Sequence, residues 1–504
     1  MLLVIEKAIE DEAKKRLARY SQSQYYKHKY ARVFTKRTGV QAIMKPHELP
    51  NAWCFHKHFD PRYCLNHAKF LARGLWNSLN SGCYTPVEAL RRTFPKASGG
   101  DRIIDAFSVP DAVVAAIFAK NLIRRNSKIF SDASYAYQEG RTNLDAILRI
   151  KGMIEGEKIF VSQYDFSKFF DSIQHNYLWD SLAKDTGFLT TNMERMVLSS
   201  VIRHSWRNLD GETGVRTVGI PQGNSISLFL ANVAAHSLDR DLEKISGTFV
   251  RFADDSIVVN LSYEDALKTS QAYARFSDRS GVAINSKKST GIRIFSSVPC
   301  EMAHVTDFTF LSYKFTPDGV FLSDRILKNI KRRCSKIIYN NLLLHLRQTR
   351  KIAKGRRGKG FVDWDLVTCL NELRRYIYGA KRQSVIDDFL KNGGKMGRMT
   401  GAVGYFALLE EGEIFRKLDG WLLFVVRSMY TYRVTLLSKT NKSTRALKGL
   451  SDAELLSGNW YNFSKVPMET SLPSFYTAWR AARKNFAKHG LGGVDSTGEG
   501  YGYE

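Results

Sequence analysis

One short stretch, "FVRFADDSIVV" at residues 249 to 259, constrains the fold more than any other part of the sequence. It places two adjacent acidic residues, Asp254 and Asp255, between two apolar runs. Runs rich in β-branched and aromatic residues are typical of strands, so the stretch predicts a β-hairpin with the acidic pair at its tip. Adjacent carboxylates repel each other and are costly to bury unpaired. Either the pair is an ordinary polar turn, where Asp is common, or the fold uses it.

A third carboxylate follows a comparable apolar run. The segment 158–166, "KIFVSQYDF", predicts a strand with Asp165 near its end. Because neighbouring strands lie about 4.8 Å apart, this strand can bring Asp165 close to the hairpin pair. Oxygen-only ligands select a hard cation such as Mg²⁺, and two such ions activate a hydroxyl nucleophile and stabilise a leaving group. The three carboxylates therefore form a candidate metal-dependent site.

The charge balance indicates a polyanionic partner. Lys and Arg outnumber Asp and Glu by 76 to 49, which gives a net charge of +27. The basic residues are interleaved with aromatic ones in the segment 20–37, "YSQSQYYKHKYARVFTKR", a pattern that favours nucleic acid over a merely soluble basic surface.

Length, cysteine usage and hydropathy narrow the class further. With 504 residues, 44% of them hydrophobic, the chain is expected to form two to four subdomains. The six Cys have no regular spacing, which fits a reducing compartment. The apolar run "WLLFVV" at 421–426 is far shorter than the roughly 18 residues of a membrane span. We expect a cytoplasmic protein without a membrane partner.

Helical and strand patterns alternate from residue 85 to 315, and the sequence then becomes helical and basic. Helices are predicted at 142–154, 225–245 and 263–279, and short strands around 282–295 and 308–315. This order favours an α+β core followed by a helical domain.

The motifs around the carboxylates follow one another in a fixed order. After Asp165 come "GIPQGNSISLFLANV" (219–233), the acidic hairpin, "GVAINSKKS" (281–289) and "FTFLSYKF" (308–315), and "FPKASGGDRIID" (94–105) and "SYAYQEGRTNLDAI" (134–147) precede it. This series resembles the reverse transcriptases of group II introns and bacterial retroelements over roughly residues 85–440.

The resemblance implies an α+β right-hand polymerase fold, with fingers, a palm built on an antiparallel sheet, a helical thumb, and helical N- and C-terminal extensions. The implied division is a basic helical extension at 1–80, fingers and palm at 81–315, the thumb at 316–440, and a C-terminal extension with a Gly-rich tail at 441–504.

The resemblance also assigns roles to individual residues. The catalytic, metal-binding carboxylates are Asp165, Asp254 and Asp255, with the Phe166 carbonyl as a further ligand of two Mg²⁺ ions, for which Mn²⁺ is an alternative. The nucleotide-binding candidates are Lys96, Arg102, Phe170, Gln222, Gly223 and Lys288. Lys287 is an open alternative to its neighbour Lys288. A bulky Phe170 implies selection against a 2′-hydroxyl, although a core aromatic is the plainer interpretation.

Two further sets are expected outside the palm. Arg374, Arg375 and Lys381 in the thumb are candidates for contact with nucleic-acid phosphates, where a structural role is an equal alternative. Tyr501 and Tyr503 lie in the Gly-rich tail, and each carries a hydroxyl from which DNA synthesis could be primed, against the alternative of a disordered terminus.

Departures from the family pattern point to one branch of it. Phe252 stands where the acidic box usually has Tyr, Ser312 stands where "FLSY" usually has Gly, and we find no HNH, RNase H or integrase motif. The chain most resembles stand-alone bacterial reverse transcriptases associated with antiphage defence. The resemblance implies an RNA-directed DNA polymerase that uses deoxynucleoside triphosphates and a noncoding RNA template to make cDNA, with homo-oligomerisation left open.

Three other functions remain as alternatives. An intron maturase or retroelement reverse transcriptase shares the fold and binds RNA. An RNA polymerase is disfavoured by Phe170. A non-enzymatic RNA-binding module would lack one of the three carboxylates, and all three are present.

Overall fold

The computed structural model describes residues 1–43, 48–95, 100–154, 159–245, 247–300, 302–349, 351, 362–440, 449–460 and 469–498. Contacts divide the chain into two units. The first comprises Met1–Tyr25, Pro46–Arg141 and Gly152–Val305, and the second comprises Tyr26–Lys45, Thr142–Lys151 and Thr306–Glu504. The long helix α1 (Leu2–Thr38) contributes residues to both.

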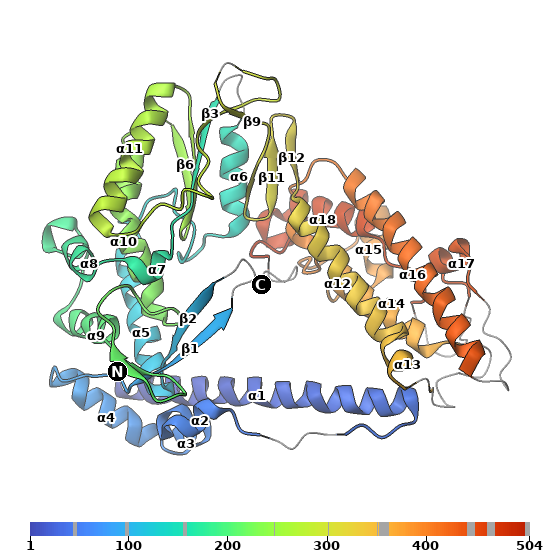
Figure 1. Cartoon of the computed structure of the whole chain (residues 1–504), viewed down its shortest axis with the longest axis horizontal. Coiled ribbons are helices and arrows are strands. Elements are labelled where there is room, and N and C mark those ends of the chain that lie inside the picture. The colour runs from blue at the N-terminus through green and yellow to red at the C-terminus, as the bar shows by residue number, and fades with distance from the viewer. Residues whose placement is uncertain are drawn as a thin grey trace. The chain divides into compact units, whose positions relative to one another are not determined.

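Two sheets form the strand content of the first unit (Figure 1). The larger has the order β6-β7-β3-β8-β9, and the smaller has the order β2-β1-β4-β5. The bounds are β1 Ala89–Pro95, β2 Asp101–Ala106, β3 Ile159–Tyr164, β4 Ser205–Arg207, β5 Thr213–Val215, β6 Thr248–Phe252, β7 Asp255–Asn260, β8 Gly291–Phe295 and β9 His304–Val305.

Helices pack around these sheets, and most of them share one hydrophobic core with strands β3, β6 and β7 of the larger sheet. Besides the start of α1, they are α2 Asn51–Phe55, α3 Pro61–Asn66, α4 Ala68–Asn80, α5 Val109–Asn126, α7 Phe169–Ser172, α8 His175–Ser181, α9 Asn192–Ile202, α10 Ser225–Glu243 and α11 Tyr263–Ser280. The central helix is α10, which packs against α5, α8 and α11 and buries residues on most of its circumference. It begins where the Asn224 side chain accepts a hydrogen bond from the Ile226 amide, a capping arrangement that fixes its first turn.

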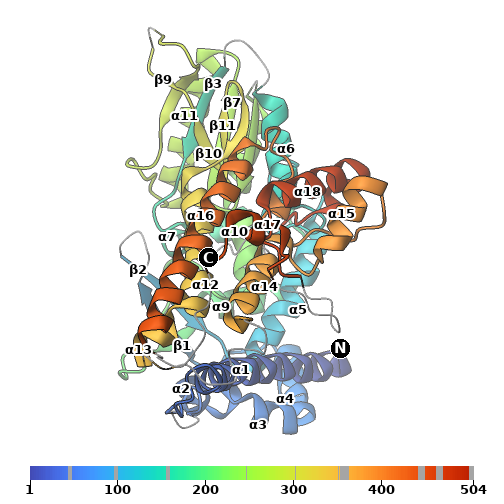
Figure 2. The same ribbon diagram turned by 90° about the vertical axis from the view of Figure 1, so that its right-hand side faces the viewer.

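The second unit contains the three-stranded sheet β10-β11-β12 and a group of helices. Its strands are β10 Phe308–Phe310, β11 Tyr313–Thr316 and β12 Gly319–Leu322. Its helices are α6 Asn143–Met153, α12 Asp324–Leu342, α13 Leu344–Thr349, α14 Trp364–Tyr378, α15 Gln383–Asn392, α16 Glu413–Thr440, α17 Asp452–Ser457 and α18 Phe475–His489. Figure 2 shows the same helices from the side.

The α+β fold class predicted from the sequence is confirmed, and the helices expected at 142–154, 225–245 and 263–279 correspond to α6, α10 and α11. The strand expected from about residue 282 begins only at Gly291. The preceding residues instead form a loop that lies against the residue after β3. In this loop the Asn285 amide donates a hydrogen bond to the Asp165 carbonyl (2.8 Å). In the part of the chain that the structure describes, no helix has both the length and the apolar character needed to cross a bilayer.

Candidate active site

Strand register brings the carboxylates together. Strand β3 pairs with β7 in antiparallel fashion, with Tyr164 opposite Ser256. The next residues in this register, Asp165 and Asp255, therefore lie beside each other at the same end of the two strands. The hairpin predicted at 249–259 is present, because β6 pairs with β7 and Phe252 lies opposite Asp255. Its two-residue turn is Ala253 and Asp254, and Ala253 has φ +59°, a left-handed conformation that a non-Gly residue adopts at a cost. The chain therefore uses a strained turn to present the acidic pair.

Polar neighbours hold Asp165 in place. The Asn285 Nδ2 donates to Asp165 Oδ2 (2.9 Å), and the Lys288 Nζ lies 3.4 Å from the same oxygen. The Asp165 amide donates to Ser289 Oγ (3.1 Å). The loop 281–289 thus wraps around the end of β3, and of the two adjacent lysines it is Lys288 that pairs with this carboxylate.

Burial and mutual repulsion raise the pKa of the hairpin carboxylates. Burial and the nearby negative charges of Asp254 and Asp165 raise the pKa of Asp255 to about 7, although Gln163 Nε2 donates to its Oδ1 (3.4 Å). The pKa of Asp254 is also raised, first by burial and then by the charge of Asp165. Near neutral pH these carboxylates are therefore only partly ionised, and a bound cation would favour their negative charge.

This charge and the donor chemistry fit divalent cations. Among the described residues, no group of three or more His, Cys, Asp or Glu side chains is already arranged around a common metal position. The three Asp residues nevertheless interact electrostatically and offer only oxygen donors, which suit Mg²⁺. Phe166, whose carbonyl is the fourth predicted ligand, is buried and forms an isolated β-bridge with Ile284.

A buried arginine anchors the acidic turn. Arg251, on β6, is 1% exposed and forms a two-pronged ion pair with Asp239 of α10, with Nε to Oδ1 at 2.7 Å and Nη2 to Oδ2 at 2.6 Å. Its Nη1 donates to the Ala253 carbonyl (2.9 Å) and to Asn232 Oδ1 (3.2 Å), and its Nη2 donates to Ser134 Oγ (2.8 Å). One guanidinium therefore ties the turn that carries Asp254 to helix α10 and to the segment around residue 134.

The loop before α10 lies against the segment that follows Asp165. The Ile220 amide donates to the Phe170 carbonyl (2.7 Å), and Gln222 Nε2 donates to Asp171 Oδ2 (3.0 Å). At Gly219 a Cβ would lie 2.6 Å from the Asp171 carbonyl oxygen, so only Gly allows this approach. Phe170 is partly buried and packs against the core, which leaves both of its predicted roles open.

The same loop also contacts the smaller sheet. The Asp105 amide of β2 donates to the Gln222 carbonyl (3.3 Å), and a Cβ on Gly223 would lie 3.1 Å from the Ile104 side chain. Asp105 is fully buried and ion-paired with Arg91 and Arg216, and His204 Nε2 lies within hydrogen-bond distance of its Oδ2 (3.1 Å). Burial acts to raise the pKa of Asp105, but these hydrogen bonds hold it well below its usual range.

Arg102 is exposed on β2 opposite Phe94, and its positive charge acts on Asp254. Lys96, predicted to act with it, lies outside the described residues.

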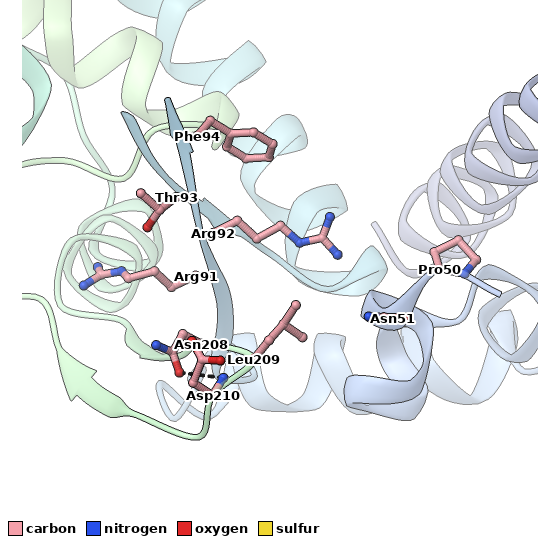
Figure 3. A pocket seen from close by; sticks show the side chains of 9 residues that line it. All are labelled: Pro50, Asn51, Arg91, Arg92, Thr93, Phe94, Asn208, Leu209 and Asp210. Atoms are coloured by element: carbon pink, nitrogen blue, oxygen red, sulfur yellow. Dashed lines mark hydrogen bonds between the residues drawn. The ribbon is translucent and has the colours of Figure 1, made fainter. Parts of the chain in front are cut away.

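A cavity of about 550 Å³ opens beside this sheet. Figure 3 shows Arg92, Phe94 and Leu209 pointing into it, toward Pro50 and Asn51, whereas Arg91 and Thr93 point the other way. Phe94 is 44% exposed and Leu209 is 55% exposed. The Arg92 Nε is buried without a hydrogen-bond partner among the described residues. The cavity thus combines an available guanidinium with apolar and aromatic surface.

Sequence reasoning missed Arg251 and Tyr137. The positive charge of Arg251 within an otherwise apolar strand was the one available signal for it. Tyr137 has φ +61°, and its pKa is raised by burial and then by the charge of Asp254. It therefore lies near the acidic turn, although nothing in its local sequence marks it.

The predicted thumb residues have different environments. Arg374 is 4% exposed, its Nε lies 3.1 Å from Glu469 Oε2, and its Nη1 donates to the Glu469 carbonyl (3.0 Å). These contacts give Arg374 a structural role, since its guanidinium is turned inward. Arg375 is exposed and Lys381 is half-buried. Tyr501 and Tyr503 lie outside the described residues.

A family model matches the part of the chain that contains the three Asp residues. Residues 94–315 match the family model described as reverse transcriptase (RNA-dependent DNA polymerase). Residues 94–315 are therefore similar to a reverse transcriptase domain, the catalytic module of RNA-directed DNA polymerases, and the fold class expected from the sequence, the right-hand polymerase, is confirmed.

Curated relatives match about a third of the chain. A Putative COX1/OXI3 intron 2 protein of Saccharomyces cerevisiae is 29% identical over 163 residues, which are 32% of this chain and 18% of that protein. Protein YkfC of Escherichia coli is 26% identical over 179 residues, 34% of this chain and 45% of that protein. The chain thus spans less than half the length of these relatives.

Solved structures with low overall similarity include an apo telomerase from Candida tropicalis, truncated from its C-terminal domain. It has a TM-score of 0.39 and 14% identity and covers 51% of this chain and 60% of that one. The RNA-dependent RNA polymerase of a human picorbirnavirus has a TM-score of 0.36 and 15% identity and covers 61% of this chain and 59% of that one.

Proposed function

We propose that this protein is an RNA-directed DNA polymerase that copies an associated noncoding RNA into cDNA by a two-metal mechanism, in a stand-alone bacterial system for antiphage defence. The observation that carries the catalytic part is the register of β3 against β7, which sets Asp165 beside Asp255 within the matched domain. The defence role is supported by the sequence resemblance alone.

The residues would divide the work as follows. Asp165, Asp254 and Asp255 would hold two divalent cations, which supply activation of the primer hydroxyl and stabilisation of the leaving pyrophosphate. Lys288 and Arg102 would orient the triphosphate of the incoming nucleotide, since both act electrostatically on Asp254. Phe170 would exclude a 2′-hydroxyl, and Gln222 and Gly223 would contact the nucleotide and template through their backbone.

The cavity in Figure 3 offers contacts for a single-stranded template. Unpaired bases stack on aromatic side chains, and arginine binds the phosphates between them. Phe94 and Arg92 offer these two contacts on the strand that pairs with the one carrying Arg102.

A test uses the full chain purified from its native locus with the RNA that accompanies it. With Mg²⁺ and deoxynucleotides, wild-type protein should make DNA that matches the bound RNA, and Asp254→Asn or Asp255→Asn should lower the rate by at least about a thousandfold, as expected when electrostatic stabilisation of a transition state is lost. Synthesis at the wild-type rate by either variant would contradict the proposal. Replacing deoxynucleotides with ribonucleotides tests the RNA polymerase alternative.

An intron maturase is the second candidate, favoured by the intron-encoded relatives. The same Asn variants distinguish the two, because RNA folding by a maturase does not need the carboxylates. Mass spectrometry after nucleotide incubation tests priming from protein, since a nucleotide adduct on Tyr501 or Tyr503 is expected only if one of them starts the product.

A further inference from the structure

The second half of helix α1 carries an uncompensated basic face. Residues 13–47 contain no Asp or Glu. Within the helix, Lys29, Arg32 and Lys36 are spaced three and four residues apart, so they lie on one side of it. All three are exposed, and in the described chain none of them takes part in an ion pair or a hydrogen bond.

The opposite side of this segment is firmly attached to its own unit. Ala31, Arg37 and Thr38 are buried, and the Phe34 ring meets the His345 ring edge-on at 5.3 Å. The Arg37 Nε lies 2.9 Å from Asp365 Oδ1, and its Nη1 donates to the Asn340 carbonyl (3.1 Å). The basic face is therefore presented by a fixed helix and not by a loose terminus.

Three like charges on one face of a helix repel one another and destabilise it slightly. The acidic neighbours that neutralise lysines at the start of the same helix are missing here: Lys7 pairs with Asp11 at 3.2 Å, Lys14 with Glu10 at 3.0 Å and Lys15 with Glu12 at 3.6 Å. A polyanion that binds along this face would relieve the repulsion. Exposed tyrosines at 26 and 30, at 55% and 51%, flank it and can stack on unpaired bases.

We propose that Lys29, Arg32 and Lys36, none of which belongs to the polymerase site, form an RNA-binding surface on the second unit that holds single-stranded RNA by its phosphates. This surface goes beyond the proposed catalytic function, because it would hold RNA whether or not the RNA is being copied.

The test measures affinity of the full chain for a single-stranded RNA by fluorescence anisotropy at several salt concentrations. The variant Lys29→Gln, Arg32→Gln, Lys36→Gln should bind more weakly at low salt. The slope of log affinity against log salt is negative, and its magnitude should decrease by about 2, since each of the three phosphate contacts with a single strand contributes about 0.7. The matched control, Lys7→Gln, Lys14→Gln, Lys15→Gln, removes three exposed lysines that already have acidic partners, and it should change the slope by less than about 0.5.

An unchanged slope in the first variant, or an equal fall in the control, would overturn the proposal. A larger loss of affinity at low salt for duplex RNA than for a single strand would also contradict the proposal, since it would indicate a surface for double-stranded RNA. Thermal melting confirms that both variants fold. Primer extension on a preformed primer–template duplex is measured separately, so a failure of polymerase activity is distinguishable from a failure of this surface.

Discussion

At the scale of single residues, the carboxyl group of Asp255 is expected to make the stability of the protein depend on pH. Since burial raises the pKa of Asp255 to about 7, the native state holds this proton more tightly than the unfolded chain does. Without divalent metal, the free energy of unfolding should therefore decrease as pH rises from about 4 to about 7, by 1–2 kcal/mol after allowance for solvent screening.

The variant Asp255→Asn should remove this dependence, raise the melting temperature at pH 8 and lack polymerase activity. Calorimetry from pH 5 to 8, with and without Mg²⁺, measures it. If the melting temperature of the wild-type protein without metal does not decrease as pH rises, the raised pKa of Asp255 is contradicted. Asp278, exposed on α11, provides a matched Asp→Asn control.

Arg251 gives a second prediction, which separates folding from catalysis. Arg251→Met leaves Asp239 buried without its partner and should cost about 3–5 kcal/mol of unfolding free energy. Adding Asp239→Leu replaces the ion pair with an apolar one and should recover most of that loss. DNA synthesis should stay low in the double variant, because the Ala253 carbonyl loses its hydrogen bond and the turn with Asp254 is no longer held. Full activity of a stable double variant would show that Arg251 has no positioning role.

The sequence predicted the three carboxylates because their signal is local: each lies at the end of an apolar run whose strand pairing can be inferred. It could not predict the contact of Arg251 with Ser134 or the interaction of Asp254 with Tyr137, since each joins segments more than a hundred residues apart. At Arg374 the structure favours the structural alternative over the phosphate contact. Basic residues at helical spacing indicate an exposed surface. The segment near residue 469 that covers Arg374 has no sequence feature that predicts this contact.

At the scale of elements, the β10–β11 hairpin gives a prediction about local strain. Phe310 pairs with Tyr313, so Leu311 and Ser312 form a two-residue turn in which both have positive φ, at +45° and +78°. Such turns favour Gly at their second position, where the family pattern also has Gly. Ser312→Gly should therefore raise the unfolding free energy by up to about 1 kcal/mol, as the cost of a left-handed non-Gly residue is removed. Denaturant unfolding measures it, with Ser335→Gly in the middle of α12 as a control that should be destabilising by a similar amount. A destabilised Ser312→Gly variant would contradict the strain.

Secondary structure was the more predictable level. The capping residues and the apolar spacing of α10 and α11 are local features of the sequence, and both helices lie close to the predicted ranges. The loop before β8 was not predictable as a loop, because its conformation depends on hydrogen bonds to Asp165 from a distant part of the chain.

At the scale of the whole molecule, the basic residues that give the net charge of +27 differ in whether an acidic partner neutralises them. Several arginines are buried and neutralised by Asp, as Arg433 is by Asp363 and Asp365 in the second unit. Composition could indicate a polyanionic partner, but only the structure separates these internal pairs from exposed, unpaired charges such as those on α1.

The guanidinium of Arg251 has a consequence for how such a chain can diverge. Because Ser134, Asn232 and Asp239 all accept hydrogen bonds from this one group, a replacement at any of the four positions leaves polar atoms stranded at the others. Over evolutionary time these four sites are expected to covary, so an aligned set of natural sequences should show them substituted jointly or not at all.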